Sequence, residues 1–148
     1  MYIADGKTNG PAFSWPDGKR IAVMVTFDYD AEFLRISRAK SKGTSIGFTD
    51  FSRGQYGPHE GLARCLDMLD TMNIKSTFFV PGAVIETYRD TVEEIHRHGH
   101  ELACHGYRHE SDPELSRDEM IKILDKSEAL LAEITGKRAP GFYAGASG

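Results

Sequence analysis

The sequence predicts an α/β domain built on a parallel β-sheet. Three short apolar runs, at residues 20–27, 75–80 and 100–104, have the length and composition of buried strands. Segments whose apolar residues recur at helical spacing separate these runs. Strands that alternate with helices form βαβ units, in which neighbouring strands run parallel. Ligands in such folds gather at the carboxyl ends of the strands, so we expect a functional site at that edge of the sheet.

The length of 148 residues fits one domain with a real hydrophobic core. Residues 1–19 are polar and rich in Gly, Pro and Asp, so we expect an irregular N-terminal segment followed by a single domain over residues 20–148. The formal net charge is −4 with both signs interspersed, which argues against nucleic acid as a partner. The apolar runs are too short to span a membrane, and residues 1–19 lack the apolar stretch of a signal peptide. With two widely separated cysteines, these features favour a cytoplasmic protein with reduced thiols.

The first strand is expected at residues 20–27, after a turn at Trp15-Pro16-Asp17-Gly18. Its continuous apolar character is typical of a parallel strand that is buried on both faces. The run ends in Asp28-Tyr29-Asp30, which places two carboxylates at the carboxyl end of the strand. Residues two apart on a regular strand face the same way, so Asp28 and Asp30 are expected to lie together.

Residues 33–57 have no clean period and are interspersed with Gly, Ser and Thr. They include five cationic residues, namely Arg35, Arg38, Lys40, Lys42 and Arg53. We expect a long loop here. Two interpretations stay open: a functional lid or binding loop, and a solvated excursion without a role.

The remaining elements alternate regularly. A helix is expected at 60–72, the second strand at 75–80, and a helical segment at 83–98 with a break near residues 88–90. Gly99 suits the position just after that helix, and the third strand follows at 100–104.

The last helix is expected from Ser116 to Thr135. Ser116 and Glu119 form a capping-box pattern, and Gly136 ends the helix. A short fourth strand is expected at residues 137–143, although Pro and Gly there shorten it.

Two histidines, His105 and His109, follow the third strand and are four residues apart. On a helix this spacing puts both imidazoles on one face. With Asp30 they would form a two-histidine, one-carboxylate set, which binds Zn²⁺, Fe, Co or Mn and leaves positions open. Asp28 would be placed to take a proton from an attacking water. The neighbouring Cys104 would point to the opposite face of its strand, so we expect a small buried side chain and not a nucleophile.

Three motifs occur in order along the chain. Thr26-Phe27-Asp28-Tyr29-Asp30 is similar to the motif T-F-D-D-G, with one residue inserted between the aspartates. His105-Gly-Tyr-Arg-His109 is similar to H-[ST]-x-x-H, and Arg138-Ala-Pro-Gly141 is similar to R-x-P-x. Together with Ser76 to Gly82 and Gly99-His100-Glu101, they resemble the polysaccharide deacetylases of the NodB-homology type, carbohydrate esterase family 4. The D-x-D spacing resembles a branch that includes peptidoglycan deacetylase-like proteins, metal-independent allantoinases and cyclic imidases.

The resemblance implies a distorted parallel β/α barrel and gives the matching residues roles. It makes Asp28 the catalytic base and Asp30, His105 and His109 the ligands of a divalent metal, with Zn²⁺ expected first. It makes Arg138 the partner that orients Asp28, and it places the N–H of Gly141 in the oxyanion hole.

The later motifs of the family supply a carboxylate partner and a histidine general acid, and the present sequence does not contain them. His59 and Glu60, at the start of a predicted helix near the same sheet edge, are candidates for a position near the substrate; the alternative is a solvated helix start. His96, His98 and His100 are expected at the opposite edge, as surface or capping residues.

The sequence therefore predicts a metal-dependent hydrolase of C–N amide bonds that acts on a sugar or another small molecule. An N-deacetylase of amino sugars is the first expectation, a cyclic imide or ureide hydrolase the second, and an inactive metal-binding domain the third. A complete β/α barrel has about 250 residues, so we expect the N-terminal portion of a barrel. A cut barrel would have an exposed sheet edge, which favours aggregation or a homo-oligomer.

Overall fold

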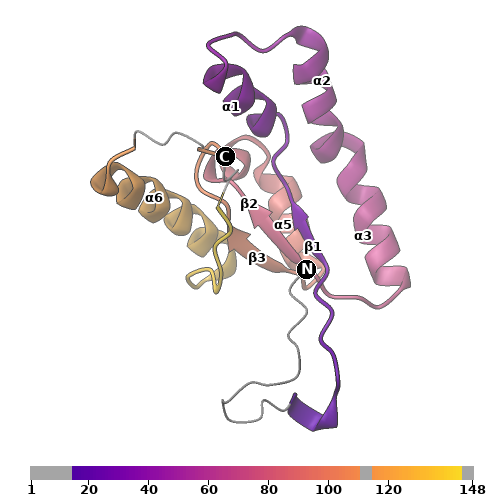
Figure 1. The fold of residues 1–148 in the computed structure, drawn as a ribbon. Helices are drawn as coiled ribbons and strands as arrows, with labels where there is room; N and C mark the ends of the chain where they lie inside the picture. The colour runs from indigo at the N-terminus through magenta and orange to yellow at the C-terminus, as the bar shows by residue number, and fades with distance from the viewer. Residues whose placement is uncertain (1–14, 111–114, 145–148) are drawn as a thin grey trace, which may run out of the picture.

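The computed structural model describes residues 15–110 and 115–144, and it confirms a parallel α/β architecture (Figure 1). The strands β1 (Thr26–Asp28), β2 (Thr77–Val80) and β3 (Glu101–Cys104) form one sheet in the order β1-β2-β3. Both strand pairs are parallel, with Asp28 opposite Phe79 and Phe79 opposite Ala103. The carboxyl ends of the three strands therefore meet at one edge of the sheet.

The hydrophobic core lies between one face of this sheet and the helices. Phe78 and Val80 of β2 and Leu102 and Cys104 of β3 are buried there, and Phe27 of β1 stacks on Phe78 with ring centroids 4.9 Å apart. Side chains from α3, α4, α5 and α6 complete the core, among them Leu66, Leu69, Val84, Ile85, Val92, Ile95 and Leu131. On the other face Thr26, Asp28 and Glu101 are exposed. The expectation of strands that are buried on both faces was therefore wrong for β1.

The predicted long loop at residues 33–57 is also wrong, because most of it is helical. Helix α1 spans Phe33–Ser41 and α2 spans Phe48–Tyr56. A single π-helical turn, Gly57–Gly61, joins α2 to α3 (Leu62–Thr71), so that a long helical column runs along one side of the molecule (Figure 1). Part of the reason for the wrong prediction is Gly54. Helix α2 packs closely against Glu32 through this residue, which has no side chain, so the sequence of α2 shows no clear apolar stripe. A Cβ atom at Gly54 would lie 2.4 Å from the Cα of Glu32.

The predicted helical segment at 83–98 is confirmed, including its break. Helices α4 (Gly82–Thr87) and α5 (Arg89–Arg97) meet at Tyr88, whose backbone leaves the helical region. Gly99 follows α5 with a φ of 76°, a left-handed conformation that suits glycine.

Helix α6 spans Arg117–Thr135 and begins and ends as predicted. The side chain of Ser116 accepts a hydrogen bond from the backbone N–H of Glu119, and the Glu119 carboxylate accepts one from the N–H of Ser116. Gly136 closes the helix in the left-handed conformation. None of the helices in the described ranges is long and apolar enough to cross a membrane.

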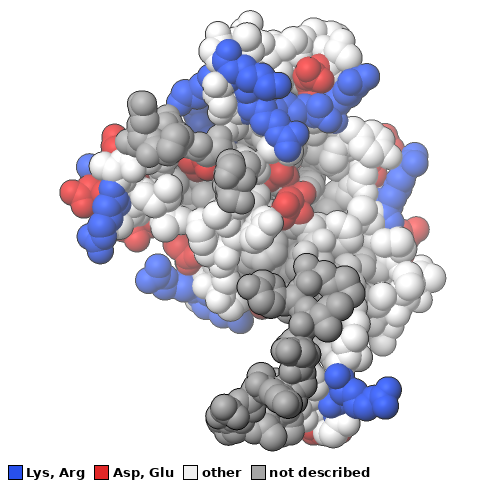
Figure 2. All heavy atoms as spheres, viewed as in Figure 1, with Lys and Arg blue, Asp and Glu red and all other residues white. Residues whose placement is uncertain are grey.

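Two strand predictions need correction. The first strand starts only at Thr26, and Ile21, Val23 and Met24 before it are 74%, 79% and 86% exposed. They lie beyond the stretch that pairs with β2, so no described strand or helix covers them. The fourth strand is reduced to a single parallel bridge between Phe142 and Cys104. Lys and Arg gather over α1 on the face shown in Figure 2, while both signs of charge alternate elsewhere.

Candidate metal centre

Asp30 lies just beyond the carboxyl end of β1. The N–H of Tyr29 still donates to the carbonyl of Phe79 at 2.9 Å, and Ala31 then turns the chain with a φ of 48°. This turn leads into α1 and leaves Asp30 only 9% exposed. The carboxylate at the end of this strand is therefore buried. Burial raises the pKa of Asp30, although the nearby His105 and His109 lower it.

His105 and His109 lie in a loop after β3, not on a helix as the spacing suggested. Gly106 and His109 both have positive φ values, 73° and 58°. The carboxylate of Glu110 accepts hydrogen bonds from the backbone N–H groups of Tyr107 and Arg108 at 2.9 and 2.8 Å. A tight turn, closed by a side chain from its own end, therefore brings the two imidazoles together.

Neighbouring elements fix this loop from outside. The first N–H groups of α4, those of Gly82 and Ala83, donate to the carbonyls of Gly106 and Tyr107. The hydroxyl of Ser37 on α1 donates to the carbonyl of His109 at 2.7 Å. The loop is thus tied to two helices, which limits the movement of the histidines.

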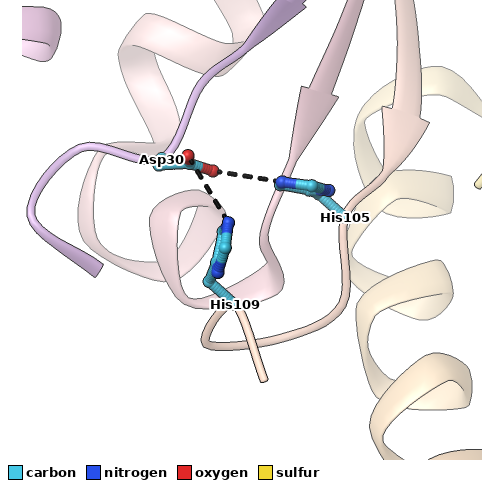
Figure 3. Close-up of side chains that lie close together, drawn as sticks. All are labelled: Asp30, His105 and His109. Atoms are coloured by element: carbon cyan, nitrogen blue, oxygen red, sulfur yellow. Dashed lines mark ion pairs between the residues drawn. The ribbon is translucent and has the colours of Figure 1, made fainter. Parts of the chain in front are cut away.

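The three predicted metal ligands converge in the structure (Figure 3). The Nε2 atom of His105 lies 3.5 Å from one carboxylate oxygen of Asp30, and Nε2 of His109 lies 3.8 Å from the other. One donor atom from each residue lies within 4.8 Å of the others. Ligands about 2.1 Å from a common centre are separated by roughly 3 to 4 Å, so this spacing suits a first-row divalent metal.

The polar atoms of the site are arranged to bind a metal, since they are not all hydrogen-bonded within the protein. The Nδ1 atom of His105 lies 2.6 Å from the carbonyl oxygen of Tyr143, so Nδ1 carries the proton and Nε2 has a free lone pair. That Nε2 atom and one oxygen of Asp30 are buried without a hydrogen-bond partner. Buried polar atoms normally have partners. Two unpartnered lone-pair atoms that face each other are the arrangement a cation would satisfy.

These residues line a cavity of about 280 Å³. Its wall consists of Asp28, Asp30, Leu34, Arg38, His105, His109, Tyr143 and Ala144. Asp28 is exposed and lies outside the group of potential ligands, although it shares the cavity. The two aspartates thus have different surroundings, one buried against the imidazoles and one open to solvent.

The expected pairing of Arg138 with Asp28 is not found. The guanidinium of Arg138 lies 3.6 Å from Glu128 of α6 and is largely exposed. Arg138 borders a hollow with His96, His100 and Glu101, at the amino end of β3. Arg138 lies at this hollow because residues 137–140 follow α6 at the edge of the sheet opposite Asp28.

Gly141 also lies away from the cavity. Its carbonyl accepts a hydrogen bond from the N–H of Cys104 at 3.0 Å, which extends the pairing along β3. The residue that reaches the site from this segment is Tyr143. Its ring stacks on His105, with centroids 5.5 Å apart and planes 12° apart. The segment thus supports a histidine, and the role of the Gly141 N–H in an oxyanion hole stays a prediction.

His59 and Glu60 do not reach the cavity either. Both are exposed in the π-helical turn, and the ring of His59 meets that of Tyr88 edge-on at 6.0 Å. They lie in the long helical column, so the interpretation as a solvated helix segment fits their position. Cys104 behaves as expected: it is fully buried, and burial raises the pKa of its thiol.

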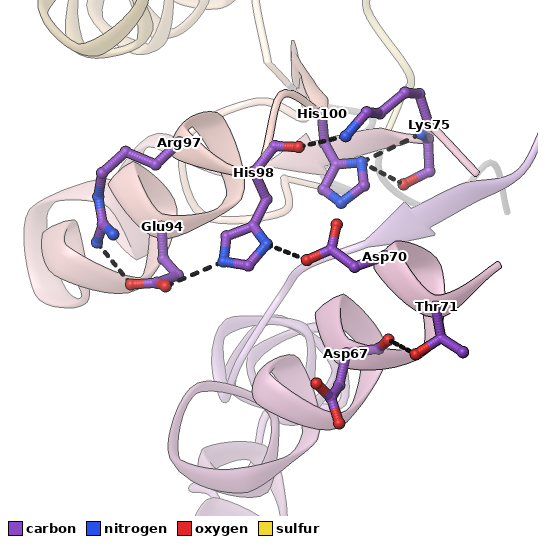
Figure 4. Close-up of polar contacts among 9 residues, drawn as sticks. Asp67, Asp70, Thr71, Lys75, Glu94, Arg97, His98 and His100 are labelled. Carbon is purple, nitrogen blue, oxygen red and sulfur yellow. Dashed lines mark hydrogen bonds and ion pairs between the residues drawn. The ribbon is translucent and has the colours of Figure 1, made fainter. Parts of the chain in front are cut away.

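The histidines at the opposite edge form polar contacts (Figure 4). His98 lies between Asp70, at 2.6 Å, and Glu94, at 3.2 Å, and so links α5 to α3. His100 is only 3% exposed, and its Nδ1 atom lies 3.3 Å from the backbone N of Ser76. The expectation of a surface or capping role was therefore wrong for His100, which is a buried acceptor.

The sequence did not predict three residues that shape the site, namely Leu34, Glu110 and Tyr143. Arg38 was named only as one of five cations in a possible binding loop, because its segment was not expected to be helical. Glu110 directly follows the second histidine. A carboxylate in this position can accept hydrogen bonds from the backbone of a preceding turn, and this pattern could have predicted the turn. Tyr143 could not be found from local pattern, because its contact depends on the path of the chain after α6.

Comparisons with known proteins agree with these motifs. The family model for polysaccharide deacetylases matches residues 16–148. A peptidoglycan deacetylase-like protein of Gibberella zeae is 34% identical over 128 residues, and a peptidoglycan deacetylase of Helicobacter pylori is 34% identical over 126 residues. Each match covers 85% of the chain, but only 37% and 42% of the respective relative. The chain thus spans less than half the length of these relatives.

Solved structures show the same relationship. A Mycobacterium smegmatis protein, provisionally described as a polysaccharide deacetylase, superposes with a TM-score of 0.80 and 38% identity, over 93% of the chain and 48% of its own length. An allantoinase reaches a TM-score of 0.81 at 23% identity, over 95% of the chain and 52% of its own length, which shows a shared fold. The sheet therefore has the NodB-type arrangement. Since the family model covers almost the whole sequence, and residues of the first two motifs form the cluster described above, the chain belongs to the polysaccharide deacetylase family.

Proposed function

We propose that this chain binds a divalent metal through Asp30, His105 and His109 and contributes to the removal of N-acetyl groups from amino sugars. Members of the family are hydrolases of C–N bonds, and its deacetylases are in general metal-dependent. The observation that carries the proposal is the pair of buried atoms, Nε2 of His105 and Oδ1 of Asp30, that face each other without hydrogen bonds.

The ligand set determines what a metal could do here. A divalent cation bound by two imidazoles and a carboxylate polarises an amide carbonyl and lowers the pKa of a water molecule. Tyr143 and the Glu110 turn hold the two imidazoles so that their Nε2 atoms face Asp30. We expect Zn²⁺ to bind first, and Co²⁺, Fe²⁺ or Mn²⁺ to compete.

Asp28 is the residue we propose as general base. Its carboxylate borders the same cavity but is not drawn into the ligand cluster, and it stays exposed. An ionised carboxylate in this position accepts a proton from water as the water attacks the amide carbon. Asp30 would hold the metal in this arrangement and so would not be free for that role.

A cyclic imide or ureide hydrolase is the second candidate. The D-x-D spacing of Asp28 and Asp30 and the Gly at position 106 favour it. The third candidate is a domain that binds metal without turnover, since the motif that supplies the family's general acid is not among those matched in this sequence.

One set of assays separates these candidates. The 148-residue chain, loaded with Zn²⁺, is incubated with N-acetylglucosamine oligomers and with succinimide and hydantoin. Release of acetate that is lost in Asp28→Asn, while zinc binding is retained, supports the deacetylase. Hydrolysis of the cyclic compounds alone replaces it with the second candidate, and zinc binding without any turnover replaces it with the third.

A further inference from the structure

Helix α1 presents a cationic face beside the candidate metal site. Arg35, Arg38, Ala39 and Lys42, at helical spacings of three and four, border a hollow of about 220 Å³. Leu34 and Arg38, four residues apart, border the cavity that contains Asp28, Asp30 and the histidines. Arg38 belongs to both walls, so the two hollows adjoin at this side chain. Figure 2 shows Lys and Arg gathered over this helix.

Most of this positive charge forms no ion pair within the described residues. Asp50 lies 3.4 Å from Arg35 and 3.8 Å from Arg53, so it serves both of these cations. In the part of the chain that the structure describes, no carboxylate lies within ion-pair distance of Arg38, Lys40 or Lys42. Arg38 lies close enough to Asp30 to help lower the pKa of that carboxyl, but it forms no ion pair with a described residue, so its exposed guanidinium is available to a ligand.

The charge balance of the cavity points the same way. Asp28 and Asp30 contribute two negative charges, which a divalent cation at the proposed site would offset. Among the residues of the wall, the charge of Arg38 would then exceed the negative charge that remains. A neutral amide substrate makes no use of this charge, whereas a substrate with an anionic group beside the amide can form charge-assisted, bidentate hydrogen bonds with the guanidinium.

We propose that the cavity selects amide substrates that carry an anionic group, a carboxylate or a phosphate, and that Arg38 binds this group. The inference rests on the proposed function, which places the amide of the substrate at the metal site. It adds that the substrate carries an anionic group beside this amide. Lys42 in the adjoining hollow extends the same charge outward, beside the ion pair of Arg35 with Asp50. Arg38 is thus a specificity-determining residue.

Three sugars with the same N-acetylated ring provide the test. N-acetylglucosamine is neutral, N-acetylmuramic acid adds a lactyl carboxylate, and N-acetylglucosamine 6-phosphate adds a phosphate. We expect the zinc-loaded chain to bind at least one anionic sugar about tenfold more tightly than the neutral one, measured by isothermal titration calorimetry. Whichever anionic sugar has the advantage identifies the source of the charge. Added salt reduces the advantage by screening.

The variant Arg38→Gln should bring the ratio of the two dissociation constants close to one. Lys40→Gln is the matched control, because it removes the same charge from the same helix at a residue that borders neither hollow, and it should keep the ratio. Equal binding of all three sugars by the parent chain, or no binding of any, overturns the inference. An unchanged ratio in Arg38→Gln does so as well.

The outcomes also separate this inference from the proposed function. Preferential binding of an anionic sugar without release of acetate upholds the inference and defeats the deacetylase. Release of acetate from the neutral and anionic sugars with the same kcat/KM and the same affinity upholds the deacetylase and defeats the inference.

Discussion

The Nδ1 atom of His105 lies 2.6 Å from the carbonyl oxygen of Tyr143, and the Tyr143 ring stacks on the imidazole. A carbonyl only accepts hydrogen bonds, so this contact sets the tautomer of His105 and directs the lone pair of Nε2 toward Asp30. A backbone group that lies 38 residues further along the chain thus prepares a metal ligand.

His105→Ala should abolish tight binding of Zn²⁺, because it removes one of the three donors that converge in the cavity. The metal content of the purified protein and calorimetric titration with ZnCl₂ measure this. His96→Ala, which removes an exposed histidine outside the site, is the control. If the stoichiometry of the metal survived in His105→Ala, the ligand assignment would be wrong.

Glu110→Gln should weaken Zn²⁺ binding by about 10- to 100-fold without unfolding the protein. The carboxylate holds the N–H groups of Tyr107 and Arg108 and so shapes the turn between the two histidines. Losses of this size are usual when a residue that orients metal ligands is changed. Competition with a chromogenic chelator measures the affinity, and Glu93→Gln on α5 is the control. Equal affinities in the two variants would contradict the role of Glu110.

Gly54→Ala should destabilise the fold by about 2 kcal/mol, because over-packing against backbone exceeds the gain in helix propensity. The new Cβ would lie 2.4 Å from the Cα of Glu32, which no side-chain rotation can relieve. Gly57→Ala in the adjoining turn meets only the ring of Tyr29 at 3.9 Å and should be neutral or stabilising. Urea denaturation followed by circular dichroism compares the two, and equal stabilities would show that α2 shifts freely.

His98 should make stability depend on pH. Hydrogen bonds to Asp70 and Glu94 raise the pKa of His98 above 6.5, so the folded state holds the proton more tightly than the unfolded state. Its contribution is therefore complete below about pH 6.5, while both carboxylates are ionised, and is lost as the pH rises through the raised pKa. Urea denaturation of the parent and His98→Gln should show a larger difference near pH 6 than near pH 9. A difference that does not vary with pH would rule out this ion pair as the cause.

The exposed apolar segment before β1 should promote self-association. Ile21, Val23 and Met24 precede an edge strand, which exposes unpaired backbone groups. Val23→Lys should shift sedimentation profiles toward the monomer at high protein concentration. Ile121→Lys on α6, also at an exposed apolar position, should not. A parent chain that stays monomeric at all concentrations would remove the predicted homo-oligomer.

Local signals predicted much of the fold. The capping box of Ser116 and Glu119, the left-handed Gly99 and the apolar run of β2 depend on residues close together in sequence, and all three occur as predicted. Helix α2 escaped detection because it contacts its neighbour through Gly54, which gives no apolar stripe to recognise.

The sequence by itself determined the family and the ends of the strands at which Asp30 and His105 lie, because parallel strands in βαβ units bring their carboxyl ends to one edge. Only the tertiary structure decided which other residues join them. Tyr143 and Arg38 enter the cavity, and Arg138 and Gly141 stay outside it. The reason is physical: these contacts join segments far apart in sequence, and they depend on how α1 and the segment after α6 pack against the sheet.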